Sequence, residues 1–223
     1  MIIRAALLVA ALVFAPLAHA DDDSCKLALG RGWPPATENY GAAVEKLFSG
    51  DVPPALSFTL LPSAAAESGL LLIPSPAGGD WALRHVVADE RVRVWSGGQL
   101  QLRTEQSPVI DQRPIPAAVA TRLLEGWREV LSAAAPEGSN APFNDGDTWV
   151  FMVADPAHRE GTLRVSGLKP TCEAGALLRE QIDLLIEASD EGDEKREKRW
   201  RQLGESLDRM RDALGTNAAT AAQ

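Results

Sequence analysis

The stretch WALRHVVADERVRVWSGGQLQLRTE (residues 81–105) alternates apolar and polar side chains along three short segments. A period of two places successive side chains on opposite faces of a β-strand. Gly97 and Gly98 separate two of the segments, and paired glycines favour the two-residue turn of a hairpin. The stretch therefore predicts an antiparallel meander with one solvated face.

Further elements extend this pattern in both directions. Two strands precede the meander, ALSFTLL (55–61) and the apolar run GLLLIP (69–74), and a late hairpin joins TWVFMVA (148–154) to GTLRVSGL (161–168). Three segments carry apolar residues at helical spacing: 37–50, 117–135 and 175–188. The sequence thus predicts an α+β fold, in which a five-strand meander and a late hairpin form an antiparallel sheet packed by amphipathic helices. We expect helices on one face and solvent on the other.

The C-terminal segment EGDEKREKRWRQLGESLDRMRDALG (191–215) is highly charged. Its apolar residues recur at spacings of three and four, as in a heptad seam: Trp200, Leu203, Leu207, Met210 and Leu214. The seam could fold back onto the protein, pair with another chain or lie on a membrane. We expect a single domain over 21–188, a charged helical appendage over 189–215 that docks on the domain or a partner, and a disordered tail over 216–223.

The N-terminus has the form of a secretory signal peptide. Arg4 precedes an apolar run over 5–15, and Pro16 and Ala18-His19-Ala20 follow it. This pattern predicts cleavage after Ala20 and export to the periplasm or the medium. The apolar run is shorter than the roughly 20 residues that a membrane span needs, so no transmembrane anchor is expected after cleavage.

The chain has two cysteines, Cys25 and Cys172. Cys25 could carry a lipid, remain a free thiol or form half of a disulfide. Residues 21–24 separate it from the apolar run, which argues against a lipid anchor. Two cysteines in an oxidising compartment tend to pair, so we predict a disulfide between Cys25 and Cys172.

The charge balance limits the classes of partner. The chain has 22 basic and 31 acidic residues and a net charge of −9, and removal of 1–20 would take away Arg4 and leave 21 minus 31, or −10. A strongly acidic chain is poorly suited to bind nucleic acid. We therefore expect a protein partner in the cell envelope.

Two short loops contain ligand-like residues. NDGDT (144–148) offers oxygen donors from Asn144, Asp145 and Asp147, but it lacks the longer pattern of a calcium loop, and turns use the same residues. DPAHRE (155–160) contains Asp155, His158, Arg159 and Glu160, which could act in acid–base chemistry or simply form a hairpin turn. We interpret His85 as a core residue. The sequence predicts no catalytic residue, metal ligand or cofactor site.

The meander also contains a candidate interaction surface. Alternation places Arg91, Arg93 and Trp95 opposite Val92 and Val94, and it places Gln99, Gln101 and Arg103 opposite Leu100 and Leu102. Because Arg and Trp are enriched in binding hot spots, we select Arg91, Arg93, Trp95, Gln101 and Arg103, with Arg84 nearby. An ordinary solvated sheet face would have the same pattern.

These features favour an exported cell-envelope protein that acts as a non-enzymatic binding module, for example an inhibitor or an accessory subunit. One alternative is a hydrolase of envelope polymers that uses scattered carboxylates, since two carboxylates can come from anywhere in a fold. Another is an assembly protein that acts through its C-terminal helix.

Overall fold

The computed structural model describes residues 27–171 and 173–221, and the backbone alone over 215–221. The predicted signal peptide and both cysteines lie outside the described residues, so cleavage and the disulfide remain predictions. The elements, in chain order, are β1 (Leu29–Arg31), α1 (Glu38–Ser49), β2 (Leu56–Leu61), β3 (Ser68–Ile73), β4 (Trp81–Val87), β5 (Arg93–Ser96), β6 (Gln99–Leu102), β7 (Val109–Ile115), α2 (Ala117–Ala134), β8 (Thr148–Ala154), β9 (Thr162–Gly167), α3 (Glu173–Asp190) and α4 (Asp193–Ala221).

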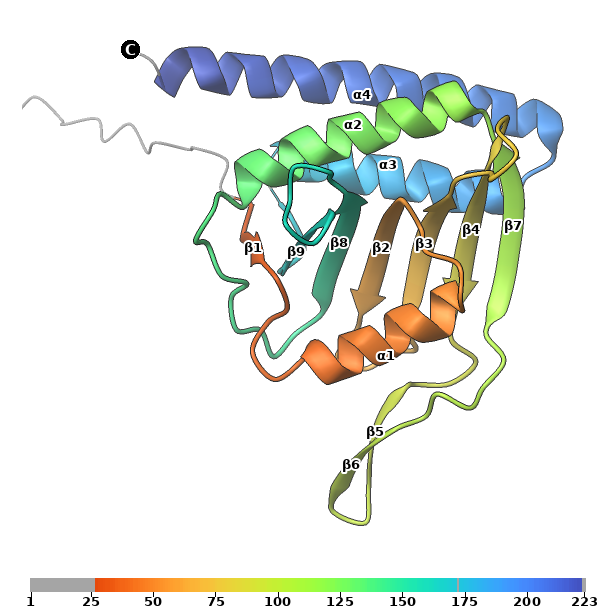
Figure 1. The fold of residues 1–223 in the computed structure, drawn as a ribbon, viewed down its shortest axis with the longest axis vertical. Coiled ribbons are helices and arrows are strands. Elements are labelled where there is room, and N and C mark those ends of the chain that lie inside the picture. The colour runs from red at the N-terminus through yellow and green to blue at the C-terminus, as the bar shows by residue number, and fades with distance from the viewer. Residues whose placement is uncertain (1–26, 172, 222–223) are drawn as a thin grey trace, which may run out of the picture.

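Seven strands form one antiparallel sheet in the order β1-β9-β8-β2-β3-β4-β7, and β5 and β6 form a separate two-stranded ribbon (Figure 1). The α+β prediction is confirmed. The five-strand meander is wrong, because its last two strands leave the sheet and β7 takes the place beside β4. The sequence did not indicate β7 as a strand because VIDQRPI carries three polar residues and Pro114; proline is tolerated in sheets mainly on edge strands such as this one.

Helices cover both faces of the sheet, which corrects the expected solvated face. Helices α2 and α3 contact one face and α4 packs against both of them, whereas α1 lies on the opposite face (Figure 1). Ser57 and Thr59, which alternation places toward solvent, are only 5% and 3% exposed and share a small cavity with Glu45 and Phe48 of α1. The central strands are therefore buried on both faces, as in a three-layer fold.

The larger core lies between the sheet and the three C-terminal helices. It contains Leu56, Leu83, Phe151 and Trp127, and it also contains four of the predicted seam residues: Trp200, Leu203, Leu207 and Met210. Leu214 is partly buried against it. The seam thus docks on its own protein, and the core continues across the boundary expected at residue 188.

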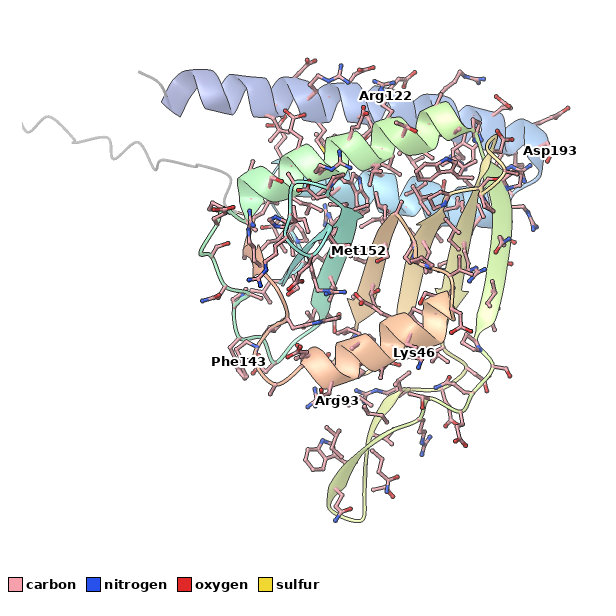
Figure 2. All side chains as sticks on the ribbon, viewed as in Figure 1. Lys46, Arg93, Arg122, Phe143, Met152 and Asp193 are labelled. Carbon is pink, nitrogen blue, oxygen red and sulfur yellow. The ribbon has the colours of Figure 1, made fainter. Side chains whose placement is uncertain are left out.

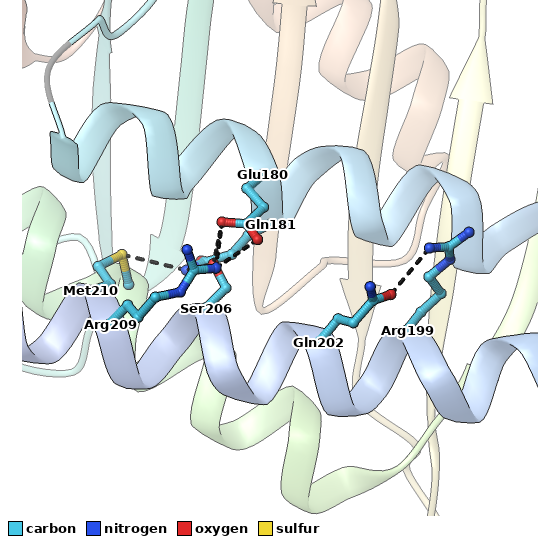
Figure 3. Close-up of polar contacts among 7 residues, drawn as sticks. All are labelled: Glu180, Gln181, Arg199, Gln202, Ser206, Arg209 and Met210. Atoms are coloured by element: carbon cyan, nitrogen blue, oxygen red, sulfur yellow. Dashed lines mark hydrogen bonds and ion pairs between the residues drawn. The ribbon is translucent and has the colours of Figure 1, made fainter.

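Helix α4 turns back along α3 after a break at Glu191 and Gly192 (Figure 1). The buried side-chain amide of Gln181 in α3 contacts both α2 and α4. The indole Nε1 of Trp127 in α2 donates to Oε1 of Gln181 in α3 at 2.7 Å. On the other side, Nε2 of Gln181 lies 3.4 Å from Ser206 Oγ of α4 (Figure 3). Arg209 donates to both carboxylate oxygens of Glu180 at the surface of the same contact.

The end of α4 differs from the sequence prediction. Its backbone stays helical to Ala221 and so continues into the tail expected to be disordered from residue 216. The sequence TNAATA (216–221) contains three alanines, which have the highest helix propensity. Among the described residues, no helix is both long and apolar enough to cross a membrane.

Replacement of Leu203 by Ala tests the docking of α4. Leu203 is fully buried in the larger core, and removal of a buried leucine side chain typically costs about 2–5 kcal/mol. We expect a loss of this size in the free energy of unfolding, measured by denaturant titration. Arg201→Ala, at an exposed position in the same turn, should change it by less than about 0.5 kcal/mol. Equal stability of both variants would contradict the docked helix.

Candidate interaction surface

The β5–β6 ribbon is the part of the predicted surface that stands clear of the sheet. It projects away from the body of the protein (Figure 1). Gly97 and Gly98 have φ angles of 60° and 78°, and positive φ at both central residues is characteristic of a type I′ turn. The predicted hairpin turn is therefore confirmed.

The strand register sets the two faces of the ribbon. Trp95 lies opposite Leu100 and Arg93 lies opposite Leu102, whereas Val94 and Ser96 lie opposite Gln101 and Gln99. Residues directly opposite in an antiparallel pair share a face. One face of the ribbon therefore carries Arg93, Trp95, Leu100 and Leu102, and the other carries Val94, Ser96, Gln99 and Gln101.

This register corrects the predicted parity. The sequence prediction grouped Gln101 with Arg93 and Trp95 and treated Leu100 and Leu102 as a buried face. Because the two-residue turn pairs Ser96 with Gln99, a residue of odd number in β5 meets one of even number in β6. Trp95 is 70% exposed, and Leu100 and Leu102 are 44% and 36% exposed. The ribbon therefore presents three apolar side chains on one side.

A buried carboxylate holds the base of the ribbon. Glu67, which precedes β3, is fully buried. Its Oε2 accepts the backbone N–H of Val92 at 2.8 Å, and its Oε1 accepts the N–H of Arg93 at 3.4 Å. The hydroxyl of Tyr40 in α1 also donates to Oε1. Glu67 thus joins the start of β5 to both β3 and α1.

Arginine side chains lie close to the contact between Tyr40 and Glu67. The guanidinium of Arg93 lies over the ring of Tyr40, 5.5 Å from its centroid, and Figure 2 shows Arg93 between α1 and the ribbon. Burial and the hydrogen bond to Glu67 raise the pKa of the Tyr40 hydroxyl well above its ordinary value, although Arg91 and Arg93 act in the opposite direction. Tyr40 therefore remains a hydrogen-bond donor over the whole physiological range.

The arginines predicted for the interaction surface mostly hold the ribbon in place. Arg91 donates from Nη2 to the carbonyl of Ser63 at 2.9 Å, and Arg103 forms an ion pair with Glu90. Arg84 lies in the main sheet, where its Nε donates to Gln112 Oε1. Trp95 is the large apolar residue of the predicted set, and it is exposed to solvent, as is Gln101 on the opposite face of the ribbon. The sequence thus predicted a cationic sheet face, whereas the structure has an apolar ribbon face.

Two of the three predicted oxygen donors of the NDGDT loop, Asn144 and Asp147, form hydrogen bonds within the fold. Asn144 Oδ1 accepts the N–H of Gly146, and Asn144 Nδ2 donates to the carbonyl of Asp147. Asp147 Oδ1 accepts the N–H and the hydroxyl of Ser63, and these bonds lower the pKa of its carboxyl. Within the part of the chain that the structure describes, no three His, Cys, Asp or Glu residues are grouped to hold a metal ion.

The DPAHRE segment forms the turn between β8 and β9. The N–H of His158 donates to the carbonyl of Asp155, and Asp155 Oδ1 accepts the N–H of Ala157. The ring Nε2 of His158 lies 2.7 Å from Nη1 of Arg31. Because a guanidinium is always a donor, this nitrogen is the acceptor. The pair lines an open hollow of about 510 Å³ beside Trp33, whose ring is covered by Arg164 at 4.8 Å.

His85 and Glu45 each lie near a charged side chain of another element. His85 lies opposite Asp111 of β7, and burial lowers its pKa while Asp111 raises it. Glu45 forms an ion pair with Arg164 at 2.7 Å, and burial raises the pKa of Glu45 against the influence of that arginine. Glu45, like Glu67, is thus engaged by neighbours within the fold.

The alkaline titration of Tyr40 tests the anchor. A folded-state pKa raised above the unfolded value of 10.0 means that the unfolded chain loses this proton first. The stability of the protein is therefore complete below about pH 10 and falls as the pH rises further. Tyr40 is the only tyrosine, so tyrosinate absorbance reports it alone. We expect this absorbance to appear together with the loss of circular dichroism. Ionisation near pH 10 in a fully folded protein would contradict the anchor.

Comparison with known proteins yields no match. No protein-family model matches the chain significantly, and neither does any curated protein or solved structure. The features of the chain that bear on its function are therefore the apolar face of the ribbon and the buried Glu67 at its base.

Proposed function

We propose that the protein is an exported, non-enzymatic binding module of the cell envelope that holds a partner protein through the apolar face of its ribbon. One observation carries the proposal: Trp95 is 70% exposed on the same ribbon face as Leu100 and Leu102. Large apolar side chains gathered on one exposed surface commonly mark an interaction site, and tryptophan is among the residues most enriched in binding hot spots.

The anchored base supports a binding role. An isolated two-stranded hairpin is marginally stable in water, and among the described strands this ribbon pairs with no third one. The bonds from Val92, Arg93 and Tyr40 to Glu67 fix where the ribbon leaves the body. An arm held in place before binding loses less conformational entropy when a partner covers it.

The position of the apolar residues indicates the kind of partner. The tip of the ribbon consists of Ser96, Gly97, Gly98 and Gln99, and the apolar residues lie on its side. A hairpin that enters a lipid bilayer would need an apolar tip, so a protein surface suits this ribbon better. No residue from 94 to 102 is charged, and we therefore expect an apolar, uncharged groove or patch on the partner.

The N-terminal sequence supports the compartment. Arg4, the apolar run that follows it and Ala18-His19-Ala20 have the order of a cleavable signal. The described neighbours of the two cysteines also favour their pairing, since a Cβ placed on Gly175 would lie 3.0 Å from Leu27 Cδ2. Leu27 follows Cys25 by two residues and Gly175 follows Cys172 by three. A disulfide there would be consistent with export.

Helix α4 is less suited than the ribbon to hold the partner. Its seam residues Trp200, Leu203, Leu207 and Met210 pack inside the main core. A second chain could reach them only if α4 left α2 and α3. The assembly alternative would therefore have to use the charged outer face of α4.

A pair of matched double variants tests the proposed function. Trp95→Ser with Leu100→Ser removes the apolar face, whereas Gln99→Ala with Gln101→Ala changes the opposite face of the same ribbon. Each protein, with a photo-crosslinker at residue 102, is exposed to its own envelope fraction. We expect one protein adduct with the wild type and with the glutamine variant, and its loss with the Trp95/Leu100 variant, because contacts buried at an interface centre dominate affinity.

Three results would overturn the proposal: the same adduct with all three proteins, no protein adduct with any of them, or crosslinking to lipid alone. Circular dichroism and melting temperature should be unchanged in both variants, because all four replaced side chains are exposed. This control separates loss of the binding face from loss of the fold.

A further inference from the structure

Strand β7 forms one edge of the main sheet. It is the last strand in the sheet order, and within the described part of the chain it pairs only with β4. One row of its backbone N–H and C=O groups therefore faces away from the sheet, which makes an edge strand a template for another strand. Val109 and Ile110 at its start are 60% and 50% exposed.

The side chains of β7 divide between the two faces of the sheet. Ile115 and Leu83, the partner of Arg113, belong to the core under the C-terminal helices, so Val109, Asp111, Arg113 and Ile115 lie on that face. Ile110, Gln112 and Pro114 lie on the face of α1, since Ile110 pairs with Val86 of the smaller core. The two charged side chains of β7 thus share one face and are two residues apart.

We propose that β7 pairs antiparallel with β7 of a second copy of this chain, about a twofold axis through Gln112, so that the two sheets join into one. In this register Asp111 lies opposite Arg113 of the second copy, and Arg113 lies opposite its Asp111. Val109 meets Ile115 and Ile110 meets Pro114. Opposite charges and apolar pairs in directly opposed positions stabilise paired strands.

The two neighbouring registers place like charges against each other. A twofold axis perpendicular to the sheet pairs residues that lie on the same face of the sheet. The axis therefore lies midway between the two copies of one residue of β7, and moving the axis to the next residue changes every pair. An axis through Asp111 would oppose two aspartates, and an axis through Arg113 would oppose two arginines. The axis through Gln112 alone among these three places each charge against its opposite.

The charges of β7 act differently from those of a protected edge. Many edge strands carry charges or proline that discourage pairing with other chains. Like charges do so because they repel when two copies meet, but Asp111 and Arg113 are complementary about Gln112. Pro114 lies next to the end of the strand and opposes Ile110, where it provides an apolar contact. This contact would cover part of the apolar surface of Ile110.

Charge reversal tests the pairing with two single variants. In the proposed register, Asp111→Arg sets two arginines against each other in both charged pairs, and Arg113→Asp sets two aspartates against each other in both. We expect the wild type to sediment at twice the chain mass and each variant to raise the dissociation constant by at least about tenfold. An equimolar mixture of the two variants restores two attractive pairs and should form a heterodimer.

Controls distinguish this edge from other surfaces. Glu105→Arg changes the net charge as much as Asp111→Arg, and Lys46→Asp matches Arg113→Asp; both positions are exposed and lie outside β7. Both control variants, and the Trp95/Leu100 variant of the ribbon, should remain dimeric. A monomeric wild type at all soluble concentrations would overturn the proposal, as would single variants that dimerise like the wild type or a mixture that forms no heterodimer.

Discussion

The buried carboxylate of Glu67 is the interaction on which the exposed ribbon depends. An enclosed carboxylate is costly unless hydrogen bonds replace the water that it loses, and here the N–H groups of Val92 and Arg93 and the hydroxyl of Tyr40 supply them. The two N–H groups belong to Arg93, the first residue of the ribbon, and to Val92 directly before it. The bonds that satisfy the carboxylate therefore also direct β5 away from the sheet, so that Trp95 reaches solvent instead of continuing the meander.

The fold class could be predicted because the relevant signals are local. The apolar spacing of α1, α2 and α3 and the alternation of β2, β4 and β9 appear directly in the sequence. The layer arrangement could not be predicted, because Ser57 and Thr59 have the same polarity on a solvated face as beneath a helix. Likewise, the apolar seam of α4 has the same sequence pattern whether it packs on its own core or on a second chain. The structure is needed to show that Leu203 is buried where α4 packs against α2 and α3.

The candidate surface was predicted in part. Trp95 was selected because arginine and tryptophan are enriched in binding hot spots, and the structure leaves it exposed. Its neighbours were assigned to the wrong face, since parity within one strand does not fix the register between two strands, which depends on the turn at Gly97 and Gly98. Glu67 was missed. A single acidic residue before an apolar strand gives no local sign of burial, because its donors come from residues 27 and 25 positions away.

Amide hydrogen exchange at Val92 and Arg93 tests the central claim most directly. In the wild type both amides should be protected, because they donate to a buried carboxylate. Glu67→Gln keeps the shape of the side chain but leaves a single acceptor oxygen. Because the two amides donate to different oxygens of Glu67, at least one of them loses its acceptor and should exchange at least about tenfold faster. Amides in the central strands β2 and β8 should keep their protection, as should Val92 in Tyr40→Phe, which retains the carboxylate. Unchanged protection of Val92 and Arg93 in a folded Glu67→Gln protein would contradict the account.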